Sequence, residues 1–200
     1  MILRSATASP FGRKVRIAAT LLGLDSRITI EPADTTNPSD TVRQQNPLGK
    51  IPALVLDDGS ALFDSRVILD YLDHVAGGGR IVPAEPKARF AALRLQALAD
   101  GIMDASILLI YEGRWRDPAK HEPKWVEHQA GKVARALAAI EADPPARTAL
   151  PDVGQIALAC ALGYQDFRFH GTWRKDHPRL GAYLEDFAAA VPAFAATKPA

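Results

Sequence analysis

The pattern of apolar residues changes type once along this chain, and that change constrains the fold more than any other feature. Before the glycine run at residues 77–79, short β-branched segments alternate with helical ones. After Pro83 and Pro86, only long segments with apolar residues at helical spacing follow. Because clusters of glycine and proline separate structural units, we expect two domains, at residues 1–78 and 85–200.

The first of these units predicts a mixed α/β domain. Residues 2–4 and 27–31 have strand patterns on either side of a helical pattern at residues 11–22, which indicates a βαβ unit with a right-handed crossover. Two apolar runs flank Asp57-Asp58-Gly59, a hairpin signal. A helical face begins at Ser65. The predicted order is β-α-β-(α)-β-β-α.

The second unit predicts helices only. Apolar stripes at residues 90–105 and 126–140 recur at helical spacing. The sequence Asp152-Val153-Gly154-Gln155 is similar to a capping box at the start of an apolar helix that runs to residue 169. His177-Pro178 begins the last predicted helix. We therefore expect an all-α C-terminal domain.

Composition excludes several kinds of function. The 24 Lys and Arg residues balance 23 Asp and Glu residues, and no block of like charge could follow a nucleic acid backbone. No apolar segment is long enough to span a membrane, and the first residues lack a signal-peptide pattern. A single cysteine, Cys160, and five scattered histidines give neither a disulfide nor a metal-site spacing. We expect a cytoplasmic protein that binds no nucleic acid, no membrane and no metal.

Three ordered motifs carry a family resemblance. The segments Ser9-Pro10-Phe11-Gly12-Arg13-Lys14-Val15, Asn46-Pro47-Leu48-Gly49-Lys50-Ile51-Pro52-Ala53-Leu54 and Phe63-Asp64-Ser65-Arg66-Val67-Ile68 have the order and spacing found in glutathione transferases. The resemblance extends over the whole chain, since residues 97–104 and 156–161 resemble helices of bacterial members. It implies a thioredoxin-like N-terminal domain followed by an all-α domain, glutathione as co-substrate, and a homodimer.

Ser9 is the candidate catalytic residue. Locally, a serine before Pro10 is typical of a helix N-cap with proline at the first helical position. The resemblance implies more, namely that the hydroxyl donates to the glutathione thiolate while the N-terminus of the helix adds positive potential. Ser5 and Thr7 lie on the same loop and are alternatives.

The resemblance also implies a glutathione site. Pro52 would follow a cis peptide bond, so that the Ile51 backbone pairs with the tripeptide like an added strand. Asp64 and Ser65 would hold the ammonium and carboxylate of the γ-glutamyl end at a helix N-terminus. Lys50 would reach the glycyl carboxylate.

The electrophile would lie between the domains, against the first long helix of the second unit. Phe11, Met103, Tyr111 and Trp115 are the candidate pocket walls, together with Ile107. The resemblance further implies that an acid on the same helix, Asp100 or Asp104, acts across the dimer. Arg13 is expected to order the seam between the domains and not to touch ligand.

The resulting hypothesis is a glutathione transferase that joins the thiolate of glutathione to small hydrophobic electrophiles. One alternative is a non-catalytic, glutathione-binding scaffold with the same fold. A further alternative is a glutathione-dependent peroxidase or thiol reductase. The lack of an active-site cysteine in the Ser9 loop counts against the last of these.

Overall fold

Four short strands form one mixed sheet in residues 1–199, the part of the chain that the computed structural model describes. The strands are β1 (Ile2–Ser5), β2 (Thr29–Pro32), β3 (Ala53–Val55) and β4 (Ala61–Leu62). Their spatial order is β2-β1-β3-β4. β1 pairs parallel with β2 and antiparallel with β3, and β3 pairs antiparallel with β4. The predicted βαβ unit and hairpin are both confirmed.

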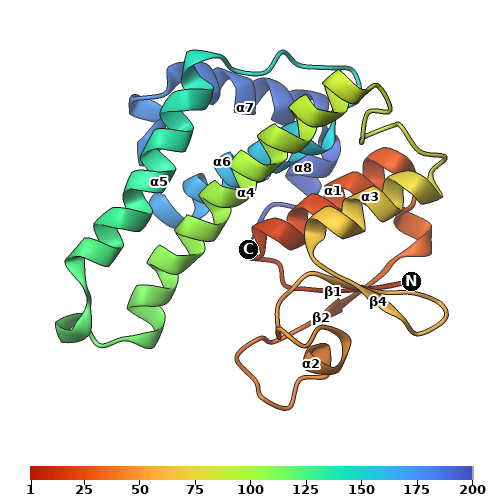
Figure 1. Ribbon diagram of the computed structural model, residues 1–200, viewed down its shortest axis with the longest axis horizontal. Coiled ribbons are helices and arrows are strands. Elements are labelled where there is room, and N and C mark those ends of the chain that lie inside the picture. Colours follow the sequence, from red (N-terminus) through yellow and green to blue (C-terminus); the bar gives the residue numbers. More distant parts are fainter. Residues whose placement is uncertain (200) are drawn as a thin grey trace.

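Three helices accompany this sheet: α1 (Pro10–Leu22), α2 (Val42–Gln45) and α3 (Ser65–Val75). In Figure 1, α1 and α3 lie on one side of the sheet and the short α2 lies on the other. Ser9 caps α1, and the helix ends at Gly23, whose positive φ of 73° favours glycine. The order of elements matches a thioredoxin-like domain.

The second domain is helical. Its helices are α4 (Pro86–Trp115), α5 (Pro123–Ala142), α6 (Val153–Phe169), α7 (Pro178–Ala190) and α8 (Pro192–Ala196). α4 and α5 lie side by side, and α6 packs against α4 (Figure 1). The capping box of α6 is confirmed, whereas α8, which is only five residues long, was not predicted. Within residues 1–199, no helix has both the length and the apolar content needed to cross a membrane.

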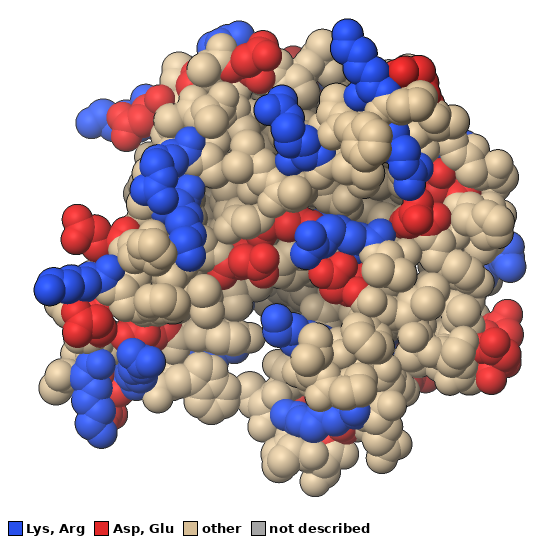
Figure 2. Space-filling view, in the orientation of Figure 1, with Lys and Arg blue, Asp and Glu red and all other residues tan. Residues whose placement is uncertain are grey.

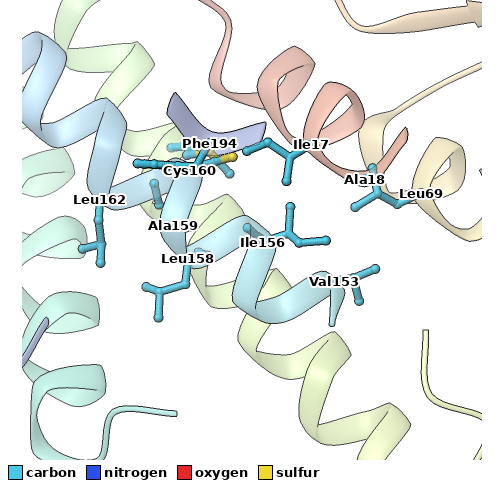
Figure 3. Close-up of a cluster of buried hydrophobic side chains, with 14 of the residues drawn as sticks. Ile17, Ala18, Leu69, Val153, Ile156, Leu158, Ala159, Cys160, Leu162 and Phe194 are labelled. Carbon is cyan, nitrogen blue, oxygen red and sulfur yellow. The ribbon is translucent and has the colours of Figure 1, made fainter. Parts of the chain in front are cut away.

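The core continues from one domain into the other through α6. Every residue of α6 from Val153 to Gln165 is buried. Figure 3 shows Ile156 pointing toward Ile17 and Ala18 of α1, with Phe194 of α8 beside Cys160. A helix that is apolar all round is a buried one, so α6 fixes the position of α1 relative to the helical domain.

Arg13 joins α1 to the end of the chain. Its guanidinium donates to the carbonyl of Phe194 at 2.5 Å and to Oγ1 of Thr197 at 3.3 Å. The guanidinium carbon also lies 3.8 Å from the centre of the Phe194 ring. The predicted role of Arg13 at the domain seam is confirmed.

The connection between the domains is held by Asp73 of α3. Its carboxylate accepts hydrogen bonds from the backbone N–H groups of Gly79, Arg80 and Ile81 at 2.7 to 2.9 Å. The Ile81 carbonyl in turn accepts from the N–H of Val153, at the start of α6. α3 ends at Val75 and α4 begins at Pro86, and the limits 1–78 and 85–200 stay a prediction.

Candidate functional site

A cleft of about 660 Å³ opens between the two domains. Its floor comes from the loop before α1 and from the loop at residues 48–51, and its walls come from α4 and α6. Figure 2 shows the surface hollowed where the domains meet, with acidic and basic side chains on its border. The volume lies within the range typical of small-molecule sites.

Ser9 lines this cleft at the first turn of α1. Its Oγ accepts a hydrogen bond from the N–H of Gly12 at 3.1 Å. A hydroxyl that accepts here still has its own proton to donate, so the capping role and a thiol contact are compatible. Of the competing hydroxyls, Ser5 is buried and Thr7 does not line the cleft.

The loop at residues 48–51 forms the opposite side of the floor. The peptide bond between Ile51 and Pro52 is cis, as predicted. Asn46 fixes this loop, because its side-chain amide donates to the Lys50 carbonyl at 2.8 Å. The Lys50 ammonium is left exposed, and both Lys50 and Ile51 line the cleft, whereas Pro52 is buried behind them.

Asp64 and Ser65 form the N-terminus of α3, outside the residues that line the cleft. Asp64 is exposed and caps the helix by accepting from the N–H of Arg66 at 2.9 Å. Ser65 is only 2% exposed. Its Oγ accepts from the ammonium of Lys14 at 3.1 Å.

Lys14 was missed by the sequence analysis, and it is the most deeply placed charge near the site. It is fully buried, and besides Ser65 it donates to Oδ1 of Asp100 at 2.6 Å. Arg66 approaches the other oxygen of Asp100 at 3.5 Å. Burial raises the pKa of Asp100, and the charge of Lys14 opposes that rise. No local signal indicates this burial, because the partner Asp100 lies 86 residues away in the chain.

The long helix α4 supplies one wall of the cleft. Ile107, Tyr111 and Trp115 line the cleft, and Phe11 faces them from α1. Met103 does not line it, because this side chain is fully buried in the core. Residues four apart turn about 40° around a helix of 3.6 residues per turn, so the stripe that begins in the core at Met103 has rotated into the cleft at Tyr111.

Two arginines also line the cleft and were not predicted. Arg114 lies on α4 between Tyr111 and Trp115, and Arg168 lies on α6 one turn beyond Tyr164. Their positions follow from helical spacing, since residues three and four apart share a face. The sequence alone did not indicate that these two faces meet.

Of the remaining acidic and nucleophilic residues, Asp104 lines the cleft, whereas Asp100 and Cys160 are buried. Asp104 lines the cleft, and burial together with the adjacent Asp100 raises its pKa. Asp100 is instead occupied by Lys14. Cys160 is fully buried, and burial raises its pKa to about 11. Within residues 1–199, no three His, Cys, Asp or Glu side chains form a group that could hold a metal ion.

Comparison with known proteins shows which family the chain belongs to. Residues 8–75 match the glutathione S-transferase N-terminal domain, and residues 123–186 match the glutathione S-transferase C-terminal domain. The chain belongs to the glutathione S-transferase family. The uncharacterized GST-like protein YibF of Escherichia coli K12 is 34% identical over 205 residues, which cover all of this chain and 98% of that protein.

Solved structures of this transferase family superpose on the chain along its whole length. A glutathione transferase family member from Pseudomonas fluorescens Pf-5, with bound glutathione, is 44% identical with a TM-score of 0.92, and covers 100% of this chain and 98% of its own. The structure of the same family member with bound S-(propanoic acid)-glutathione has a TM-score of 0.89, and the match covers 100% of both chains. A glutathione S-transferase from Methylobacillus flagellatus KT with glutathione bound is 33% identical, with a TM-score of 0.91 and coverage of 100% and 99%.

Proposed function

We propose that this protein is a glutathione transferase, in which the thiolate of bound glutathione attacks small hydrophobic electrophiles. The observation that carries the proposal is the position of Ser9, which faces the interdomain cleft with a hydroxyl proton that no group among residues 1–199 accepts. Glutathione bound in similar structures supports the ligand.

Ser9 favours the ionised form of the thiol in this proposal. An unperturbed thiol has a pKa of about 8.5, so it is mostly protonated at neutral pH. A hydrogen bond donated to the thiolate stabilises the charged form, and the N-terminus of α1 adds positive potential at the same place. The thiolate is the nucleophilic form, so these two contributions raise the concentration of the reactive species.

The tripeptide lies across the floor of the cleft. The backbone of Ile51, set by the cis bond to Pro52, pairs with the cysteinyl unit, and Lys50 binds the glycyl carboxylate. Asp64 and Ser65 hold the γ-glutamyl end at the N-terminus of α3. The ammonium of Lys14 lies directly behind the Ser65 hydroxyl and adds positive charge under the γ-glutamyl carboxylate.

The electrophile occupies the remaining volume of the cleft, against the apolar wall of Phe11, Tyr111 and Trp115. Attack forms a carbon–sulfur bond, and either a leaving group departs with its electron pair or a proton adds to the carbon next to the attacked one. The S-substituted glutathione bound in the Pseudomonas structure supports room for a substituent on sulfur in this family.

The family also suggests an oligomeric state, a cellular location and a biological role for this activity. We propose a homodimer that acts in the cytoplasm and removes reactive electrophiles by joining them to glutathione. In a dimer, Asp104 is the acid on α4 that remains available to a partner subunit's ligand, because Asp100 is already paired with Lys14.

The test is calorimetric titration with glutathione and S-hexylglutathione, together with steady-state turnover of an aryl halide. We expect micromolar to millimolar binding by the parent protein, greatly weakened in Ser65→Ala. Ser9→Ala should keep most of its affinity and lose turnover. Absence of binding by the parent would overturn the proposal and favour a scaffold role. Binding with hydroperoxide turnover above aryl halide turnover would favour a peroxidase instead.

A further inference from the structure

Two cations face the same cleft from different helices. Arg114 lies near the C-terminus of α4, and Arg168 lies near the C-terminus of α6. Each is accompanied by a tyrosine of its own helix, at spacings of three and four residues. The Arg114 guanidinium carbon lies 5.1 Å from the centre of the Tyr111 ring, and that of Arg168 lies 5.9 Å from the Tyr164 ring and 4.3 Å from the Phe167 ring. The aromatic rings hold the two guanidinium groups at the cleft wall.

Neither arginine has an acidic partner among residues 1–199. Arg116, two residues beyond Arg114, pairs with Glu112 at 3.1 Å, so an acid of the same helix turn is already taken. The Nε of Arg168 is buried and lacks a hydrogen-bond partner. A buried donor without a partner is costly, and a cation without a counter-charge at a ligand-sized cleft is a ready anion site.

The charge of the cleft differs from that of the chain. The whole chain has a balance of +1, but the cleft is lined by Lys50, Arg114 and Arg168 against a single acid, Asp104. Burial and the adjacent Asp100 raise the pKa of Asp104. A positive cleft with low-dielectric walls concentrates anions.

Arg114 lies far along α4 from the proposed γ-glutamyl site, although it lines the same cleft as Ser9, Lys50 and Ile51. Arg114 follows Asp100 by 14 residues along α4, which corresponds to about 21 Å of helix. Asp100 is bound to Lys14, which holds Ser65 at the proposed γ-glutamyl site. The glycyl carboxylate already has Lys50. Arg114 and Arg168 line the cleft together with Tyr111 and Trp115, the wall assigned to the second substrate.

We propose that the electrophile of this enzyme carries an anionic group, most simply a carboxylate, which Arg114 and Arg168 bind while its apolar part packs on Tyr111 and Trp115. This inference rests on the proposed transferase function. For an unsaturated acid, the thiolate adds to the β-carbon and the α-carbon takes a proton from water. For a halogenated acid, the halide leaves with the bonding electron pair.

The test compares two conjugates, S-(3-carboxypropyl)glutathione and S-butylglutathione, which differ only in a carboxylate against a terminal methyl group. Calorimetric titration of the parent protein should show at least about tenfold tighter binding of the carboxylated conjugate, as expected for charge-assisted hydrogen bonds. The preference should shrink as salt is raised, because screening weakens partly exposed ion pairs.

The variants are Arg114→Met, Arg168→Met and the double substitution, with Arg135→Met on α5 as the matched control outside the cleft. Each single variant should reduce the preference, the double variant should abolish it, and the control should retain it. Affinity for unmodified glutathione should change less than about threefold in all four. Circular dichroism and a denaturant titration establish that each variant is folded.

Three results would overturn the inference. The parent could bind both conjugates equally, or the double variant could keep the full preference. Glutathione itself could lose affinity in parallel with the carboxylated conjugate, which would assign the arginines to the tripeptide. A parent that binds neither glutathione nor either conjugate would instead contradict the transferase function, so the two failures are distinguishable.

Discussion

The ammonium of Lys14 donates to the carboxylate of Asp100 at 2.6 Å, and the pair is buried between the two domains. Lys14 belongs to α1 and Asp100 to α4. The same ammonium reaches Ser65 of α3, so one charge connects both domains with the proposed γ-glutamyl site. Removal of Lys14 would leave the buried Asp100 carboxylate with only the Arg66 guanidinium, at 3.5 Å, and removal of Asp100 would leave the Lys14 ammonium buried without a counter-charge.

Lys14→Met should destabilise the protein by about 3–5 kcal/mol, because it leaves the Asp100 carboxylate without its main compensating charge. Urea unfolding followed by circular dichroism measures the loss. The double variant Lys14→Met with Asp100→Leu should recover most of it, since an apolar pair of similar volume needs no desolvation of charge. Equal losses in the single and double variants would contradict this account of the pair.

Ser9→Ala should shift the pH dependence of turnover to higher pH. Without the hydroxyl donor, the pKa of the bound thiol rises toward its ordinary value of about 8.5. The rate loss should be at least about tenfold at pH 6.5 and should shrink by pH 9, where the thiol ionises unaided. Ser9→Thr keeps a hydroxyl and should retain the parent profile. A pH-independent loss would mean that Ser9 acts by position alone.

Cys160 should resist thiol reagents in the folded state. Its pKa of about 11 leaves about one thiolate in a thousand at pH 8, and the side chain is fully buried. Labelling with a chromogenic disulfide should proceed only after unfolding, in proportion to the denatured fraction. Rapid stoichiometric labelling of the native protein would contradict the structural role assigned to this residue.

The same residue predicts a pH dependence of stability. Its folded-state pKa is raised above the ordinary 9.0, so the unfolded chain releases the proton first as pH rises. The stabilising contribution is complete below about pH 9 and falls by about 2–3 kcal/mol between pH 9 and 11. Cys160→Ala lacks this titration, so its stability difference from the parent should narrow over that range. A constant difference would contradict the assignment.

Two glycines of the helical domain should respond oppositely to alanine. At Gly154, an added Cβ would lie 2.5 Å from the carbonyl oxygen of Ala92 and 2.9 Å from Cβ of Leu95. Gly154→Ala should therefore push α6 from α4 and cost about 1–3 kcal/mol. At Gly101 no atom lies within 4 Å of an added Cβ, and Gly101→Ala should stabilise by about 0.5–1 kcal/mol. Thermal unfolding compares the two, and a loss at both positions would contradict the predicted difference.

Much of the site's framework could be predicted because its signals are local. The Ser9-Pro10 start of α1, the capping box at Asp152 and the turn at Gly59 each depend on residues within four positions of one another. The family motif supplied the cis bond before Pro52, which propensity alone would have set as trans. Such caps and turns depend on neighbouring residues and not on the tertiary arrangement, so they can be predicted from the sequence.

The cleft position expected for Met103 and the missed burial of Lys14 have one physical cause, which is packing between elements far apart in the chain. Met103 and Tyr111 belong to the same apolar stripe, but the stripe turns around α4, and only packing against α6 decides where the core ends and the cleft begins. Lys14 was not singled out because a lysine in an amphipathic helix is ordinarily exposed, and its burial depends on Asp100, 86 residues away.

The sequence by itself determined the two-domain order, the strand and helix types, and the family, because these depend on periodicity, turn residues and short motifs. Only the tertiary structure decided which face of α4 lines the cleft, that Arg114 and Arg168 line the same cleft, and that Lys14 is buried against Asp100. Each of these depends on a contact between residues far apart in the chain. Long-range contacts are fixed by the packing of whole elements, and no local pattern records them.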